Sequence, residues 1–217
     1  MILVVGHTKG GTSTSSLAVN LTVAAARHGK RKVLLVDGDQ QATAAGFTAL
    51  RAQNGITDFT AVVLTGTAIR TQVRLLAPNY RHVVIDCGGG QDTASFRASL
   101  TVADKLLVPV PPRTFDFWAT EQLLPIIMEA QEINPSLRAY SVLGLANSSG
   151  CDNAQVAELL RGFEPKLTYL DTPIVRRKAW SDAAAQGLAV HEYKPRNSKA
   201  VSELVALYKA IFRKGQK

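Results

Sequence analysis

Cysteine is scarce in this sequence, and its scarcity excludes two kinds of stabilising framework. Only Cys87 and Cys151 occur among 217 residues. Two cysteines cannot form a network of disulfide bonds or a zinc site with four sulfur ligands. Because chains with few disulfides are at home in a reducing compartment, we expect a cytoplasmic protein.

Long hydrophobic runs and targeting signals are also missing. No apolar run reaches the roughly 18 residues that a membrane-spanning helix needs. The first residues, 1–6, have neither the basic stretch nor the cleavage site of a signal peptide. Hydrophobic residues make up 46% of the chain and charged residues 19%. This composition is typical of a globular protein, and the length fits one domain over residues 1–217.

Acidic residues are rare in the last quarter of the chain. Residues 1–160 hold 13 Lys and Arg against 12 Asp and Glu, whereas residues 161–217 hold 12 against 5. Almost all of the net charge of +8 therefore lies near the C-terminus. An excess of this kind favours an anionic partner such as nucleic acid or an acidic membrane surface. A basic helix kept for solubility explains the charge equally well.

Short apolar runs alternate with segments of helical periodicity. The runs predict buried strands at 2–5, 33–36, 82–86, 105–110, 140–146 and 167–170. Helices are expected at 15–28, 93–101, 117–131, 153–162, 179–186 and 199–214, and segment 40–79 is expected to hold a helix, a short strand and a second helix. Gly29 is expected to end the first helix, and Trp118 and Trp180 are expected to pack in the interior. This alternation predicts an α/β fold, a mainly parallel twisted sheet with helices on both faces.

The loop after the first predicted strand is rich in small residues. Residues 7–16 read His-Thr-Lys-Gly-Gly-Thr-Ser-Thr-Ser-Ser. A turn of this kind between a strand and a helix can point backbone N–H groups at phosphate, and the helix N-terminus adds about half a positive charge. Ser15 is placed to hold a magnesium ion through its hydroxyl. The alternative is a tight strand–helix turn that binds nothing.

Aspartates end two further predicted strands. Asp37 and Asp39 follow the run at 33–36, and Asp86 ends the run at 83–85. An apolar strand that ends in aspartate is the generic Walker B pattern, in which the carboxylate holds magnesium through a water. The glycines at 88–90 are expected to form a mobile switch. Each motif is weak alone, since turns rich in Asp and Gly are common, but their order and spacing make them strong together.

These segments resemble the motifs of the ParA/MinD family of deviant P-loop ATPases. The family's loop reads K-G-G-x-G-K-[ST], and this sequence has Lys9-Gly10-Gly11-Thr12-Ser13-Thr14-Ser15. Residues 107–117, 174–179 and 187–193 are similar to later segments of the family, the first of them to its I-P-x-x-P-S-x-x-D segment, so the resemblance covers nearly the whole chain. The short length is similar to small plasmid-partition members such as ParF. The resemblance implies the P-loop NTPase fold.

The resemblance also implies cofactors and site residues. It implies ATP, with contacts from Lys9, Gly10, Gly11, Thr12, Ser13, Thr14, Ser15, Ser16 and, near adenine, Asn147. It implies Mg2+ held by Ser15, Asp37 and Asp86. The implied catalytic residues are Lys9, which would reach the nucleotide of a partner copy, and Asp39, which would position the attacking water.

Two departures from the family loop affect the expected activity. Thr14 stands where the family has its phosphate-binding lysine, and Ser13 stands where it has glycine. Thr14 has no charge, so a charge-assisted contact worth roughly 1.5–3 kcal/mol is absent. Thr14 is either natural or an introduced substitution. The chain is therefore either a partition ATPase or a hydrolysis-deficient nucleotide-binding adaptor that keeps the fold and binds DNA.

The partners expected from the resemblance are a second copy of the chain, DNA and an activating protein. The ATP-bound homodimer would bind DNA without sequence preference and segregate a plasmid or other mobile DNA on the nucleoid, and a ParB-like centromere-binding partner would stimulate hydrolysis. No membrane is expected, because the apolar positions of the last helix are typical of a core-facing helix. The expected DNA contacts are Arg176, Arg177, Lys178, Lys199, Lys209, Arg213 and Lys214.

Two other enzyme classes use related folds. Iron–sulfur reductases related to the nitrogenase iron protein need paired cysteines, and Cys87 and Cys151 do not match their spacing. A small-molecule ligase of the dethiobiotin-synthetase type would not explain Lys9 together with a basic C-terminal quarter.

Overall fold

A computed structural model describes residues 1–28, 32–88 and 93–212. Seven strands form one sheet in the order β3-β2-β4-β1-β5-β6-β7, and every neighbouring pair is parallel. The strands are β1 (Ile2–Gly6), β2 (Val33–Asp37), β3 (Thr60–Val63), β4 (His82–Cys87), β5 (Lys105–Val110), β6 (Arg138–Leu143) and β7 (Thr168–Leu170). The predicted α/β class is confirmed, with a sheet that is wholly parallel.

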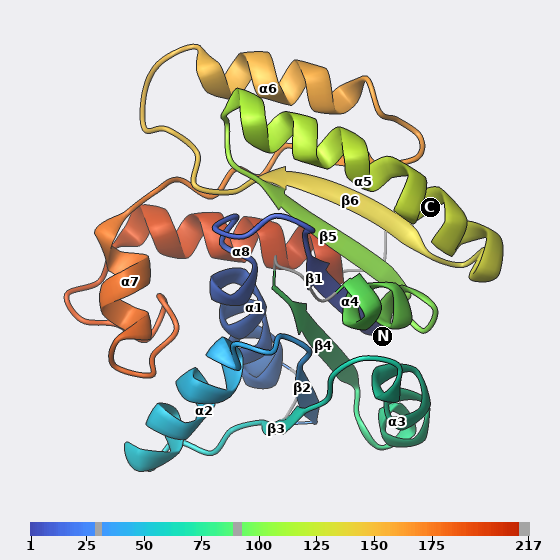
Figure 1. The fold of residues 1–217 in the computed structure, drawn as a ribbon. Coiled ribbons are helices and arrows are strands. Elements are labelled where there is room, and N and C mark those ends of the chain that lie inside the picture. The colour runs from blue at the N-terminus through green and yellow to red at the C-terminus, as the bar shows by residue number, and fades with distance from the viewer. Residues whose placement is uncertain (29–31, 89–92, 213–217) are drawn as a thin grey trace.

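Helices cover both faces of the sheet (Figure 1). One layer contains α1 (Thr14–His28), α2 (Thr43–Gln53), α7 (Lys178–Ala184) and α8 (Ser198–Phe212). The other contains α3 (Ala68–Leu76), the 3-10 turn η1 (Ala77–Asn79), α4 (Thr93–Leu100), α5 (Thr114–Ile133) and α6 (Asp152–Arg161). None of the described helices is long and apolar enough to span a membrane.

The apolar strand runs explain this two-layered core. Side chains along a strand alternate between the two faces of the sheet. In β1, Val4 packs with the layer of α3 to α6, whereas Leu3 and Val5 pack with the layer of α1 and α8. Both sets are fully buried, so each position of the strand must be apolar. This is why the strands read as unbroken apolar runs.

Most predicted elements lie within a few residues of their observed positions, including the helix, strand and helix of segment 40–79. The helix predicted at 117–131 begins earlier, at Thr114, with Pro125 inside it. The strand predicted at 140–146 ends at Leu143, because Leu145 adopts a left-handed conformation with φ 53°. The predictions for Gly29, for Gly89 and Gly90, and for positions 213–214 fall outside the described residues.

The two tryptophans differ. Trp180 is buried as predicted, and its indole N–H donates to the Val175 carbonyl oxygen. The prediction for Trp118 is wrong, because its side chain is 52% exposed. It forms an edge-to-face pair with Phe115, which is 71% exposed, at a centroid distance of 5.4 Å. The first turn of α5 therefore presents two large aromatic side chains to solvent.

Candidate functional site

Three predicted motifs meet at one edge of the sheet. Because all strands are parallel, their carboxyl ends lie on the same side. The register sets Gly6 beside Cys87 and Asp37 beside Asp86. The loop after β1 and the aspartates after β2 and β4 are thus brought together, as the sequence predicted.

Asp39 lies directly against Gly88. A Cβ atom added to Gly88 would come within 2.0 Å of a carboxylate oxygen of Asp39. A real Cβ never approaches so closely, so only glycine fits at position 88 while Asp39 keeps this position. The turn after β2 and the first glycine of the predicted switch after β4 are therefore in contact at this point.

The loop after β1 is fastened to α5 through a buried histidine. His7 is 1% exposed, and its Nδ1 accepts the backbone N–H of Lys9 at 2.9 Å. Nε2 must then carry the ring proton, and it donates to the Thr120 hydroxyl at 3.1 Å. Burial lowers the pKa of His7 to about 4, although the nearby Asp116 carboxylate opposes this. The ring is therefore neutral at pH 7.

A second link to α5 involves the lysine that the family resemblance singles out. The Nζ atom of Lys9 lies 2.6 Å from a carboxylate oxygen of Asp116. Asp116 is 3% exposed, and its other oxygen has no hydrogen-bond partner among the described residues. Lys9 is thus held within its own chain. Asp116 is the site residue that our sequence reasoning missed, although it is the aspartate of the segment at 114–117.

Two residues of the loop after β1 have a left-handed backbone conformation. Ser13 has φ 70° and Gly11 has φ 77°, both left-handed. A left-handed residue with a side chain costs about 1–2 kcal/mol, so Ser13 adopts the conformation that the family's glycine adopts freely. Thr14 is buried, and its hydroxyl lies 2.9 Å from that of Thr12. The position of the missing lysine is thus filled by a neutral side chain.

Asp86 is the clearest sign that a cation belongs at this edge. Its side chain is fully buried, and although the Ser15 hydroxyl interacts with it, neither carboxylate oxygen has a partner at ordinary hydrogen-bond geometry among the described residues. Burial raises the pKa of Asp86 to about 7, and the neighbouring Ser15 hydroxyl offsets only part of this rise. A buried carboxylate without such a partner is costly, and a divalent cation would remove that cost. Ser15 and Asp86 therefore fit a magnesium site.

Asp37 lies beside Asp86 and also organises the backbone around it, and its predicted part in holding magnesium stays a prediction. Its two oxygens accept the backbone N–H groups of Asp39 at 3.1 Å and of Ala45 at 2.7 Å. Asp37 thereby holds the turn after β2 and the start of α2. Among the described residues, no cluster of three or more His, Cys, Asp or Glu side chains is arranged to hold a metal.

Asn147 lies in the loop after β6, at the same edge of the sheet. Its side-chain amide donates to Asp152 at 3.0 Å, and its backbone N–H donates to the side-chain oxygen of Asn153 at 3.0 Å. These bonds tie the loop to the start of α6. Contact between Asn147 and adenine stays a prediction.

The cations predicted to contact DNA fall into three groups. Arg176, Lys178, Lys199 and Lys209 are exposed. Arg177 is only 20% exposed and forms an ion pair with Glu203 of α8 at 2.6 Å, so it fastens α8 and has little freedom to meet a phosphate. Arg213 and Lys214 lie outside the described residues.

Comparison with known proteins identifies relatives over most of the chain. No model of a known protein family matches it. It is 27% identical over 203 residues to the maintenance of carboxysome distribution protein A of Halothiobacillus neapolitanus. The matched region covers 93% of this chain and 92% of that protein. It is also 26% identical over 209 residues to the chromosome partitioning protein ParA of Myxococcus xanthus. That match covers 77% of this chain and 73% of the relative. Over most of its length the chain is thus similar to members of the ParA/MinD family of deviant Walker A ATPases.

Solved structures of the ParA/MinD family share this fold. The ATP complex of a single-residue variant of McdA from Cyanothece matches the chain with a TM-score of 0.81 at 15% identity, covering 100% of this chain and 98% of that one. This likeness shows the fold, which is that of a P-loop NTPase. The predicted family resemblance and fold are therefore confirmed. The names of the two relatives refer to carboxysome distribution and to chromosome partitioning. The sequence analysis had instead favoured the plasmid-partition members of the family.

Proposed function

We propose that this chain is a positioning ATPase of the ParA/MinD family. It binds ATP with Mg2+ at the edge formed by β1, β2 and β4, dimerises with ATP bound, and binds DNA without sequence preference. The observation that carries this proposal is the fully buried Asp86 carboxylate, which lacks a partner at ordinary hydrogen-bond geometry among the described residues and lies beside the loop after β1. The cargo can be a plasmid, a chromosome or a protein assembly.

The proposed mechanism gives each group at the edge one task. Backbone N–H groups of the loop at 10–15 hold the phosphates. Ser15 and Asp86 would hold Mg2+, which would neutralise part of the triphosphate charge. Asp39, placed against Gly88, orients the water that attacks the γ-phosphate. A ParB-like partner would speed hydrolysis and so release the dimer from DNA.

Lys9 connects nucleotide binding to dimerisation in this proposal. It is paired with Asp116 in its own chain, and to reach the nucleotide of a second copy it must exchange this carboxylate for phosphate. The exposed pair Phe115 and Trp118 flanks Asp116 in the first turn of α5. Large exposed aromatic side chains are enriched where proteins associate. They support the view that a second copy docks at this edge.

Removing Lys9 is expected to weaken the ATP-dependent dimer about tenfold or more, since one charge-assisted contact across the interface is lost. The measurement is analytical ultracentrifugation with and without ATP and Mg2+. Lys9→Ala alone leaves Asp116 buried without its cation, so Lys9→Ala/Asp116→Asn serves as the second variant and keeps the fold. If the wild-type chain stays monomeric with ATP, or if the double variant dimerises as tightly as wild type, the proposed switch is wrong.

We infer that DNA binds at the opposite end of α1, where the surface is basic. Two hollows of about 430 Å³ each lie on either side of Tyr208 in α8. The cations that line them, besides histidines, are Arg27, Arg81, Lys194, Arg196 and Lys209. Among the described residues, no acidic side chain lines either hollow. Because the whole surface lies on one chain, a dimer would carry two copies and gain affinity through avidity.

Neutralising two of these cations is expected to weaken DNA binding and its dependence on salt. Each lost phosphate contact lowers the slope of log affinity against log salt by about 0.9 for duplex DNA. The variant Arg196→Gln/Lys209→Gln is therefore expected to show a slope smaller by about 1.8. The control, Arg161→Gln/Lys166→Gln, removes the same charge from exposed positions at and after the end of α6. Equal slopes for the two double variants would contradict the proposed surface.

The second candidate function is a nucleotide-binding adaptor without turnover. The observation that favours it is Thr14, which is buried, neutral and bonded to Thr12 at the position of the family's lysine. Phosphate release from ATP distinguishes the two functions, because an adaptor binds ATP and dimerises but releases no phosphate above background.

A further inference from the structure

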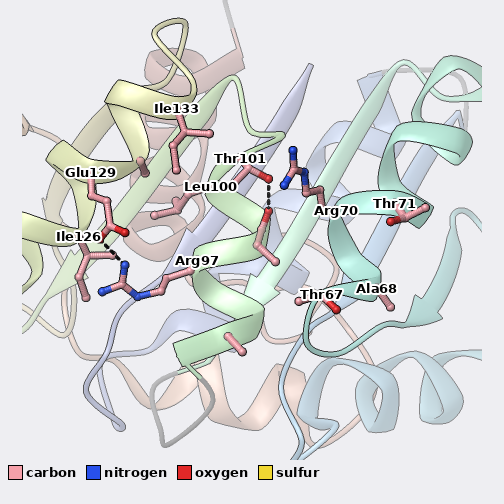
Figure 2. Close-up of a pocket in the computed structure, with 13 residues that line it drawn as sticks. Thr67, Ala68, Arg70, Thr71, Arg97, Leu100, Thr101, Ile126, Glu129 and Ile133 are labelled. Atoms are coloured by element: carbon pink, nitrogen blue, oxygen red, sulfur yellow. Dashed lines mark hydrogen bonds and ion pairs between the residues drawn. The ribbon is translucent and has the colours of Figure 1, made fainter.

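A groove of about 660 Å³ lies between α3, α4 and α5 (Figure 2). It shares no residue with the loop after β1, with Asp37, Asp39 or Asp86, or with the basic hollows beside Tyr208. The nucleotide site and the proposed DNA surface therefore leave it unused.

Two helices line this groove with a regular stripe of side chains. From α4 and the residue after it come Ala94, Arg97, Ala98 and Thr101, with the buried Leu100 beside them, and from α5 come Ile126, Glu129, Ala130 and Ile133. Apart from Leu100, both sets follow the spacing i, i+3, i+4, i+7, which is the stripe that one helix presents to another. The small side chains at 94, 98 and 130 let a backbone approach closely. Two facing stripes of this kind form a seat for a third helix.

The charges around the groove favour an acidic occupant. Arg70 of α3 and Arg97 of α4 reach over it, and Arg97 forms an ion pair with Glu129 of α5 (Figure 2). Arg70 is exposed and takes part in no ion pair within the described residues. The lining therefore carries one cation in excess. Beside these charges, Ile133 leaves 60% of its side chain exposed at the groove.

We propose that this groove docks an amphipathic helix of a partner protein, with apolar side chains on one face and carboxylates beside them. The apolar face lies on the alanines and isoleucines of α4 and α5, and a carboxylate pairs with Arg70. A helix fits better than a small ligand because the two stripes extend over two turns each. Docking does not require nucleotide, so it stands apart from the proposed ATP and DNA binding.

The opposite side of α4 gives docking a direct physical route to the nucleotide site. Phe96 packs so closely on Gly6, the last residue of β1, that a Cβ at Gly6 would lie 2.6 Å from its ring. The hydroxyl of Ser95 accepts the backbone N–H of Gly66, which precedes α3. A shift of α4 would therefore press on the strand that leads into the phosphate loop.

The test uses two synthetic peptides with free ends blocked, each about 15 residues long, because shorter isolated helices are marginal. Both carry Leu and Ala on one helical face, and the other face carries Glu in one peptide and Lys in its twin. Affinity is measured by fluorescence anisotropy without nucleotide. We expect the Glu peptide to bind the wild-type chain at least about tenfold more tightly than the Lys twin.

Variants of the groove test where the Glu peptide binds. Ala94→Trp fills the groove from an exposed position and is expected to weaken binding of the Glu peptide more than about tenfold. Arg70→Gln removes the cation that pairs with the peptide and is expected to weaken binding about threefold to fivefold. Arg74→Gln removes an exposed cation from the same helix outside the lining, and it is expected to leave affinity unchanged. If Ala94→Trp does not fold, Ile133→Glu replaces it, since like charge at an exposed position repels the peptide without disturbing the core.

Three results of the peptide measurements would overturn the proposal. They are equal affinity for the two peptides, unchanged affinity in the groove variants, and absence of binding at millimolar peptide. A nucleotide-independent dimer of the wild-type chain that Ile133→Glu dissociates would also overturn it, because a second copy would then be the occupant. Failure of the ATP-dependent dimer has no bearing on these measurements.

Discussion

Replacing Thr14 by lysine is expected to tighten ATP binding by about 10-fold to 150-fold. A hydrogen bond from a charged donor contributes roughly 1.5–3 kcal/mol, and each 1.4 kcal/mol corresponds to a factor of about ten. Ser13 already has φ 70°, the left-handed conformation of the family's glycine before the lysine. The edge of the sheet also holds the buried carboxylates of Asp37 and Asp86, which a nearby cation would compensate.

The matched control is Thr14→Met, which adds similar bulk without charge. Calorimetry with ATP and Mg2+ measures the affinity, and phosphate release measures turnover. Tighter binding together with phosphate release would show that Thr14 alone limits a competent ATPase. Tighter binding without release would favour the adaptor function. No gain in affinity over Thr14→Met would show that Thr14 is not what weakens nucleotide binding.

The sequence was sufficient to predict which strand ends meet, but not which side chains pair there. Apolar runs alternating with helices predict parallel strands, and parallel strands bring their carboxyl ends to one edge, so the loop after β1, Asp37 and Asp86 were expected at the same edge. That Asp37 and Asp86 are direct neighbours depends on the order of the strands, which the structure supplies. The contact between His7 and Thr120 joins residues 113 positions apart. It depends on how α5 packs beside the loop, which no local pattern records. The pairing of Lys9 with Asp116 was missed for the same reason.

Exposure was harder to predict than secondary structure. Composition favours a buried tryptophan, yet Trp118 lies on the outer side of the first turn of α5, whereas Asp116 in the same turn is directed inward. Arg177 was one of a basic triplet, and the triplet gave no sign that Glu203 would engage its middle member. In both cases the rotation of a helix or turn decides the outcome, and residues close together in the sequence take opposite roles.

Replacing Asp86 by asparagine is expected to stabilise the nucleotide-free protein while weakening its Mg2+-dependent ATP binding about 10-fold to 100-fold, the usual loss for outer groups of a metal site. Burial raises the pKa of Asp86 from its ordinary value of 3.8 to about 7. Between these two values the folded chain keeps a proton that the unfolded chain releases. The contribution of Asp86 to the free energy of unfolding therefore falls as pH rises from about 4 to about 7. The asparagine of the variant does not titrate, so the variant lacks this dependence.

The measurement is the melting temperature of wild type and Asp86→Asn at pH 5 and pH 8, in EDTA and in Mg2+ with ATP. Other titrating groups, such as His7, are common to both proteins and cancel in the difference between them. In EDTA the variant is expected to gain most over wild type at pH 8, where Asp86 is charged. Mg2+ with ATP should remove that gain, because the cation then compensates the carboxylate. Asp171→Asn, at an exposed position, is the control for loss of charge alone. If Asp86→Asn melts below wild type at pH 8 in EDTA, the Asp86 carboxylate has a partner within the chain, and the inference of a magnesium ion at this edge is wrong.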